Sequence, residues 1–352
     1  MVDFSAVGRR LLQAPGASLL LGGLERLGTW PPGRLCTLTY HRVTEMSDDG
    51  RHPGLISATP VEFEQHLDVL EERYNIVSLD MVLAARAGRG ALPPNAVLLT
   101  FDDAVDDFVD HTLPTLLDRA VPAVLFVPTG FVDRDDAWFW WDAVHAAVMK
   151  TERSSLPGEP IGSLPLLNDG ERSAAFGELR NYFKQIPWSR TIAEVSELTT
   201  ALGVVPPPAD VMGWADVRKA AEAGIAVCPH TRTHPHLDQL GIDEVRGEIA
   251  GSLDDLREHL GTVPSAFAYP SGQWTPDVRA VVDELGFELA FTTRRAAHDL
   301  GSADPLLIGR FNVSRRTGMN ALRLQMLPWS DRLQRSDHRV HAVEGARGSL
   351  MP

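Results

Sequence analysis

The 352-residue chain has few cysteines, few basic residues and no long apolar run. Its two cysteines, Cys36 and Cys228, allow at most one bridge and form no CxxC motif, which excludes a disulfide framework; we interpret both as buried free thiols. No segment approaches the roughly 18 consecutive apolar residues of a membrane-spanning helix. The 33 Lys and Arg against 47 Asp and Glu give a formal net charge of −14, which argues against nucleic acid or anionic membrane as a partner.

The N-terminal segment contains an apolar stretch that Pro15 and Gly16 interrupt, preceded by Arg9 and Arg10. The interruptions do not fit the continuous apolar region of a signal peptide. We therefore expect a helical extension over residues 1–34, amphipathic in character, and a cytoplasmic protein. Weak association with a membrane surface through this helix stays open, and the sequence does not indicate an oligomeric state.

From residue 35 onward, short apolar runs alternate with helical patterns, which predicts a parallel α/β sheet, closed as a barrel or open. Strands are expected at 35–40, 75–79, 96–101, 122–128, 225–228, 266–270 and 289–293. One helix is expected to begin at Pro60, with Thr59 as its N-cap and Glu62 completing a capping box. Further helices are expected at about 214–223, 243–260 and 275–286.

Residues 138–210 interrupt this alternation with several tryptophans and Gly/Pro clusters. We expect a mostly helical insertion within one catalytic domain of residues 35–330, not a separate domain. Residues 331–352 have little apolar periodicity and are expected to form a flexible tail.

Polar side chains follow several of the predicted strands at the point where each strand ends. In parallel α/β folds, functional residues gather beyond the carboxyl ends of the strands. The candidates on this edge are His41 and Arg42, Asp102 and Asp103, His230 and His234, and the segment 269–272.

The segment "HTRTHPHL" places His230 and His234 four residues apart. Two imidazoles and one carboxylate make a three-ligand zinc site with an open position. Since no HExxH motif is present, the base must come from elsewhere, and the Asp pair supplies a ligand and a neighbouring base. Either motif alone is more often a surface feature, but together at strand ends they favour a metal site. His236 is an alternative ligand, although its position after Pro235 favours a loop role.

Four segments, "LTYHRV", "LLTFDDA", "HTRTHPHL" and "FAYPSG", together resemble the polysaccharide deacetylases, the NodB-homology or carbohydrate esterase family four group. The likeness spans about residues 35–315 outside the insertion. It implies a distorted (β/α) barrel that binds a divalent metal, usually zinc, and removes N- or O-acetyl groups from sugars. By position, the resemblance implies that Asp102 is the catalytic base and that Asp103, His230 and His234 bind the metal.

The chain also departs from the family pattern. Ala104 stands where the family has glycine, a mild change if the backbone there is ordinary. The segment 268–272 replaces Arg-Pro-Pro-Tyr-Gly, so the arginine that orients the base is missing and Ser271 takes the place of the tyrosine whose N–H lines the oxyanion hole. No Leu-x-His motif supplies the general acid; we expect His41 instead, with a purely structural loop histidine as the alternative. Arg310 either anchors the base or substrate, or is a solvated arginine.

The substrate contacts we expect are Tyr269, Ser271, Trp274 and Trp140, because flat indole faces suit pyranose rings. For Trp141, packing inside the insertion is the favoured interpretation, and Asp142 is a weak candidate for contact with the substrate amine. Asp106 and Asp107 are expected in the first turn of the next helix, where acidic side chains complement the macrodipole.

The sequence thus predicts a metal-dependent N-deacetylase, with Zn²⁺ as the expected metal and an acetylated carbohydrate as the expected partner. The acetamido sugar would belong to a polysaccharide or a glycan precursor. Two alternatives remain: a carbohydrate-binding protein that has lost catalysis on the same fold, and a deacylase of a non-sugar amide.

Overall fold

The computed structural model describes residues 16–26, 28–46, 50–156, 158, 161–315 and 318–328. The expectations for residues 1–15 and for the tail at 331–352 lie outside the described residues. The central sheet is built from β1 (Arg34–Tyr40), β4 (Asn75–Ile76), β5 (Ala96–Phe101), β6 (Val124–Val127), β7 (Ala226–Pro229), β10 (His298–Asp299) and β11 (Phe311–Asn312). The α/β class is confirmed.

The sheet has the strand order β10-β1-β5-β6-β7, with β11 also paired to β1 and β4 to β5. All of these pairs are parallel except β1 with β10. Two small parallel pairs lie apart from this sheet: β2 (Arg42–Val43) with β3 (Ile56–Ala58), and β8 (Ala266–Ala268) with β9 (Leu289–Phe291). The parallel arrangement brings the carboxyl ends of β1, β5, β6 and β7 to one edge.

Side chains of the central strands alternate between two apolar layers, as the two-residue period of a strand requires. Leu38 of β1 and Leu99 of β5 lie in one cluster with residues of α3 (Pro60–Arg73), α5 (Leu113–Asp118) and α9 (Trp214–Glu222). Leu98 lies in the other cluster, with residues of β8, β9 and α4 (Leu79–Arg86). Both faces of the sheet are therefore covered, which explains its continuous apolar runs.

The helix boundaries follow local sequence signals. At the start of α3, the Thr59 hydroxyl accepts from the Glu62 N–H at 3.1 Å and the Glu62 carboxylate accepts from the Thr59 N–H at 2.8 Å, so the predicted capping box is confirmed. The strand expected at 75–79 is shorter, because Ser78 caps α4. The helices α10 (Ile242–Leu260) and α11 (Pro276–Glu284) pack on β8 and β9.

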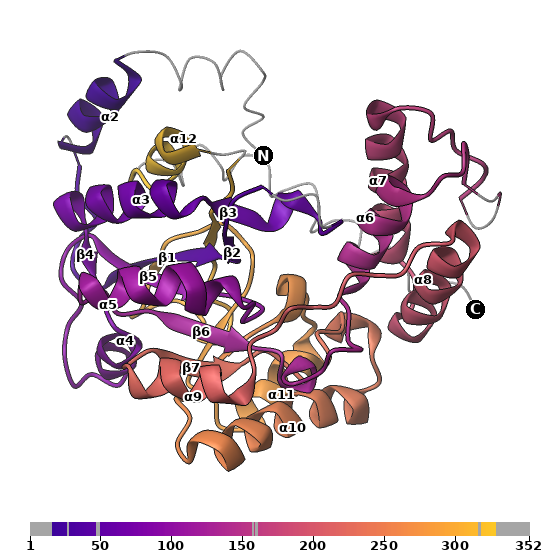
Figure 1. Ribbon diagram of the computed structural model, residues 1–352. Helices are drawn as coiled ribbons and strands as arrows, with labels where there is room; N and C mark the ends of the chain where they lie inside the picture. The colour runs from indigo at the N-terminus through magenta and orange to yellow at the C-terminus, as the bar shows by residue number, and fades with distance from the viewer. Residues whose placement is uncertain are drawn as a thin grey trace, which may run out of the picture.

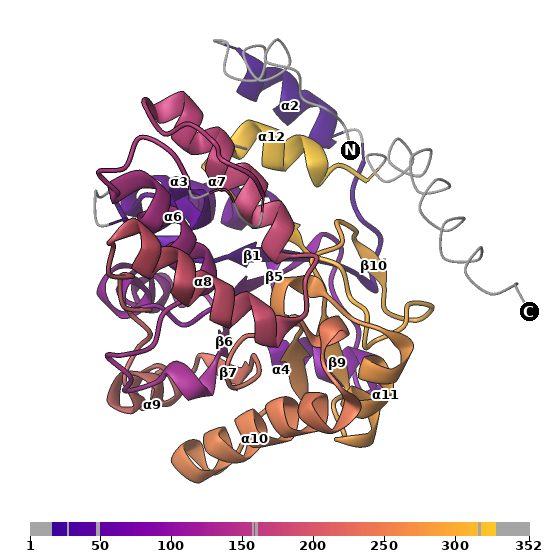
Figure 2. The same ribbon diagram turned by 90° about the vertical axis from the view of Figure 1, so that its right-hand side faces the viewer.

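The region 138–210 contains α6 (Trp140–Lys150), α7 (Asp169–Phe183) and α8 (Trp188–Leu202), which share an apolar cluster of their own. In Figure 1 these helices lie at the side toward which the arrow of β6 points, and Figure 2 looks onto this side. The insertion thus covers the edge where the predicted site residues gather. The division into domains stays a prediction.

Near the N-terminus, α2 (Ala17–Arg26) packs against α12 (Gly318–Gln325), where Arg323 pairs with Glu25 at 2.8 Å. Among the described residues, no helix combines the length and the apolar character needed to cross a membrane.

Candidate active site

The Asp pair follows directly on β5, and both carboxylates are buried, with 4% of each residue exposed. Asp103 and Ala104 have φ angles of 71° and 46°, in the left-handed region. The condition under which alanine at position 104 is a mild change, an ordinary backbone, is therefore not met: the residue occupies a conformation that glycine adopts more easily, at a cost of roughly 1–2 kcal/mol. Its methyl group is fully buried in the core beside the sheet, which offsets part of this cost.

Three side chains converge beside this turn. Asp103, His230 and His234 each offer one ligand atom, and these atoms lie within 4.8 Å of one another. The His230 and His234 Nε2 atoms lie 3.8 Å and 3.4 Å from the Asp103 Oδ1 atom. That oxygen is buried and has no hydrogen-bond partner among the described residues, a costly arrangement unless a cation is bound. The three residues therefore fit a divalent metal ion.

His230 and His234 are uncharged, which is the form in which an imidazole can bind metal. The His230 Nδ1 atom lies 2.7 Å from the Ala268 carbonyl oxygen, which fixes the ring and leaves Nε2 facing the cluster. Burial lowers the pKa of His230 to about 4 and lowers the pKa of His234 well below its usual value. Both imidazoles are thus neutral at neutral pH. Burial raises the pKa of Asp103, and the charges of Asp102 and Asp142 add to this; a bound cation would oppose all three effects.

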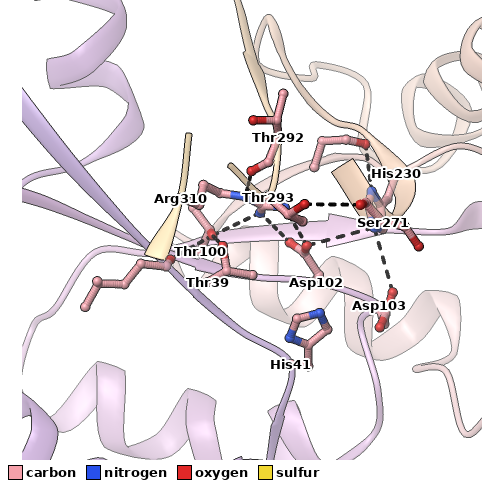
Figure 3. A network of polar contacts seen from close by, with 12 residues as sticks. Thr39, His41, Thr100, Asp102, Asp103, His230, Ser271, Thr292, Thr293 and Arg310 are labelled. Atoms are coloured by element: carbon pink, nitrogen blue, oxygen red, sulfur yellow. Dashed lines mark hydrogen bonds and ion pairs between the residues drawn. The ribbon is translucent and has the colours of Figure 1, made fainter. Parts of the chain in front are cut away.

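The other carboxylate of the pair, Asp102, is bound by Arg310. The two guanidinium Nη atoms donate to the two Asp102 oxygens, each at 2.7 Å, as Figure 3 shows. Arg310 is 1% exposed, and it also donates to the Thr292 carbonyl oxygen at 3.1 Å and the Thr100 hydroxyl at 3.2 Å. Of the two alternatives for Arg310, the structure therefore supports an anchor, of Asp102, and excludes the solvated arginine.

The ion pair determines the charge of Asp102. Burial by itself would raise the pKa of this carboxyl, but the charge of Arg310, followed by that of His230 and the hydrogen bonds from Arg310, lowers the pKa to about 2. Asp102 is thus ionised at neutral pH. The guanidinium comes from the residue before β11, far along the chain from the segment where the family places its arginine.

His41 follows β1, and its backbone N–H donates to the Ser57 hydroxyl at 2.9 Å. Figure 3 places its imidazole next to Asp102, on the side away from Thr292. Burial lowers the pKa of His41, the Asp102 charge opposes this shift, and the Arg310 charge adds to it. The predicted acid is therefore close to the predicted base.

Ser271 lies in the one-turn helix Pro270–Gly272 after β8, with a φ of 53°. Its carbonyl oxygen accepts from the Thr293 hydroxyl at 3.1 Å, a bond drawn in Figure 3. Gly272, with a φ of 72°, approaches Thr293 so closely that a Cβ atom would lie 2.5 Å from the Thr293 nitrogen. The turn thus needs glycine at this position.

The aromatic residues predicted to contact substrate differ in exposure. Trp140 is 2% exposed and packs against Trp141 and Phe183, and Tyr269 is completely buried. Neither ring has a free face, so the expectation that these two contact substrate does not fit the structure. Trp274 is 39% exposed and keeps a ring available.

The insertion is in aromatic contact with the loop that carries His234. The rings of Trp141 and His234 lie 4.9 Å apart in an edge-to-face arrangement. His236 is buried near Trp140 and Trp188, with centroid distances of 6.0 Å and 5.8 Å, and is not part of the three-ligand cluster. The loop role expected for His236 therefore agrees with its position better than the ligand role.

The second acidic pair lies at the start of the next helical segment, as expected. A π-helical turn, Phe108–Thr112, directly follows Asp107 and continues into α5 at Leu113. Asp107 is 7% exposed, and it also accepts from the Arg42 side chain at 2.7 Å and from the Val43 N–H at 3.2 Å. Asp107 therefore has a second structural contact that was not expected: it binds the strand that follows His41.

Comparison with known proteins identifies the family. The family model for polysaccharide deacetylase matches residues 89–290, more than half of the chain. The chain belongs to the polysaccharide deacetylase family. The matched region includes Asp102, Asp103, His230 and His234, whereas His41 and Arg310 lie outside it.

This member of the family is 32% identical, over 101 residues, to an Escherichia coli K12 protein named poly-beta-1,6-N-acetyl-D-glucosamine N-deacetylase. The match covers 29% of this chain and 15% of that protein. Among solved structures, IcaB from Ammonifex degensii is similar with a TM-score of 0.56 at 22% identity, over 84% of this chain and 97% of that one. The Streptococcus pyogenes deacetylase PplD in complex with acetate has a TM-score of 0.53 at 21% identity, over 84% and 100%. These structures share the fold.

Proposed function

We propose that this polysaccharide deacetylase family member is a metal-dependent hydrolase that removes the N-acetyl group from an acetamido sugar in a polysaccharide or glycan precursor. The observation that carries the proposal is the buried Asp103, His230 and His234 cluster beside the ionised Asp102. The name of the Escherichia coli relative supports an N-acetylated sugar as substrate. Zn²⁺ is the proposed metal, because two neutral imidazoles and a carboxylate suit it.

The proposed mechanism assigns a distinct task to each carboxylate. When bound by Asp103, His230 and His234, a divalent cation supplies Lewis acidity, which polarises a carbonyl group and lowers the pKa of water. Asp102 takes the proton from the water that attacks the acetyl carbon. Arg310 holds both oxygens of Asp102, so that the base keeps one orientation throughout the reaction.

The remaining steps use groups on the same edge of the sheet. The Ser271 N–H is proposed to donate to the oxyanion that forms on the acetyl oxygen. His41 is proposed to deliver a proton to the sugar nitrogen as the C–N bond breaks, which releases acetate and a free amine. Trp274 is proposed to stack on a sugar ring, since its indole is partly exposed.

The alternative of a carbohydrate-binding protein without catalysis depended on the missing family arginine and the missing terminal histidine. Because Arg310 binds Asp102 from another part of the chain, the first of these reasons no longer applies. A module that only binds sugar has no need of a buried, ionised carboxylate next to a metal cluster. The geometry therefore favours the enzyme.

The proposal is tested by metal analysis and acetate release. Purified protein loaded with Zn²⁺ is incubated with β-1,6-linked and β-1,4-linked N-acetylglucosamine oligomers, and with an N-acetylated amino acid that represents a non-sugar amide. We expect acetate from the acetamido sugars only, lost on treatment with a chelator and restored by Zn²⁺. Absence of metal binding, or acetate from the amino acid alone, contradicts the proposal.

A further inference from the structure

The loop that carries the metal-facing His234 contains two residues in an unfavourable backbone conformation. Thr231 and His234 have φ angles of 68° and 54°, and neither is glycine. Left-handed backbone is unfavourable at such residues and persists only where the surroundings hold it. The loop between β7 and the next short helix therefore needs partners outside itself.

Glu248 of α10 binds Arg232 and Thr233, the two residues that lie between Thr231 and His234. One of its carboxylate oxygens accepts from the backbone N–H groups of Arg232 and Thr233, each at 2.8 Å. The other oxygen accepts from the Thr233 hydroxyl at 2.7 Å. Bonds to an ionised acceptor are roughly twice as strong as neutral ones, and consecutive N–H groups form a concave anion-binding surface.

Other contacts also hold this loop. The His234 N–H donates to the Thr231 hydroxyl at 3.1 Å, and the Arg232 carbonyl oxygen accepts from the Gly130 N–H at 2.8 Å. The Arg232 side chain pairs with Asp255, which lies about two helical turns after Glu248 in α10. Glu248 is thus the acceptor for both backbone N–H groups that directly precede His234.

We propose that Glu248 is a positioning residue for the metal centre: by binding the Arg232 and Thr233 backbone, it fixes the conformation in which the His234 imidazole faces Asp103. The inference rests on the proposed function to the extent that this cluster binds a metal. Glu248 does not belong to the three-ligand cluster, so it acts through the loop. Its removal should weaken metal binding by freeing the loop to relax to an ordinary backbone.

The experiment measures metal binding to the apoprotein, independently of catalysis. Zn²⁺ affinity is determined by competition with a chromogenic chelator, and the visible spectrum of the Co²⁺-loaded protein reports ligand geometry. The variants are Glu248→Ala, Glu248→Gln, which keeps one neutral acceptor oxygen, and Glu258→Gln as the matched control on the exposed side of α10. We expect a roughly 10–100-fold loss of affinity for Glu248→Ala, in the range of partners that orient metal ligands, and a smaller loss for Glu248→Gln.

We also expect a weakened Co²⁺ spectrum in Glu248→Ala and wild-type behaviour in Glu258→Gln. Unchanged affinity and spectrum in Glu248→Ala overturn the inference. If the melting curve of the Glu248→Ala apoprotein shows that it does not fold, Glu248→Gln decides: reduced affinity supports the inference and wild-type affinity overturns it. Failure of the wild-type protein to bind metal overturns the proposed function instead, so the two failures are distinguishable.

Discussion

Arg310 and Asp102, 208 residues apart in the chain, form an ion pair in which two parallel hydrogen bonds of 2.7 Å join the guanidinium to both carboxylate oxygens. The planar guanidinium matches a carboxylate in this two-fold way, and an ammonium group cannot. The resemblance to the family implies a contact of this kind from the segment after β8; here the guanidinium comes from the residue before β11.

Arg310→Met should destabilise the protein and reduce turnover, because it leaves the Asp102 charge buried without its partner. Losing one member of a buried pair costs about 3–5 kcal/mol of unfolding free energy. Urea unfolding measures this cost, and acetate release measures turnover. Combining Arg310→Met with Asp102→Asn should restore part of the stability but none of the activity. A single Arg310→Met variant as stable as the wild type would contradict the role of the pair.

Asp106→Asn should stabilise the protein at alkaline pH more than at acidic pH. Burial, followed by the charges of Asp210, Asp110 and Asp216, raises the pKa of Asp106 from 3.8 to about 6. The folded state then binds this proton more tightly than the unfolded state, so ionised Asp106 opposes folding above about pH 6 and this effect disappears as the pH falls toward 4.

Melting temperatures at about pH 8 and about pH 4 test this linkage. We expect a gain for Asp106→Asn at the higher pH and little change at the lower one. Asp118→Asn, on an exposed helix position, is the control and should leave both values unchanged. An equal gain for Asp106→Asn at both pH values would contradict the raised pKa.

His41→Gln should reduce turnover while it leaves metal binding intact, because His41 lies next to Asp102 and outside the three-ligand cluster. Loss of a general acid typically costs about 10²–10⁴-fold in rate. Steady-state acetate release and metal content of the same preparation give both values. A metal-free His41→Gln protein would make the residue a ligand, and full turnover would leave it a structural histidine.

Asp102, Asp103 and His230 were predictable because they come directly after buried parallel strands, and His234 because it lies four residues after His230 in the same loop. Parallel strands bring their carboxyl ends together, so local patterns are enough to bring together residues about 130 positions apart. The capping box of α3 was predictable for a similar reason, since all its bonds are local.

The Arg310 contact depends on how β11 approaches β1, which no local pattern encodes. The available signal was an arginine inside the apolar segment "LLIGRFNV", in a chain that lacks the expected arginine after β8. The bond between Asp107 and Arg42 was not predictable for a comparable reason: Arg42 comes from a different strand.

The aromatic residues illustrate a different limit. Trp140 and Trp274 are chemically equivalent in the sequence, yet one is 2% and the other 39% exposed. Only the packing of α6 against its neighbours in the insertion determines this difference. The Glu248 contact was equally hidden, because an acidic side chain on the polar face of a helix does not indicate which backbone it binds.

The most direct test of the account compares Asp102→Asn with Asp103→Asn, two adjacent and isosteric changes. Metal content per chain and acetate release from N-acetylglucosamine oligomers are measured on both proteins and on the wild type. We predict that Asp102→Asn binds metal like the wild type but loses at least about 10²-fold in turnover, the scale of a general base, while Asp103→Asn loses both metal and turnover. Full turnover in Asp102→Asn, or full metal content in Asp103→Asn, would contradict the division of tasks between the two carboxylates.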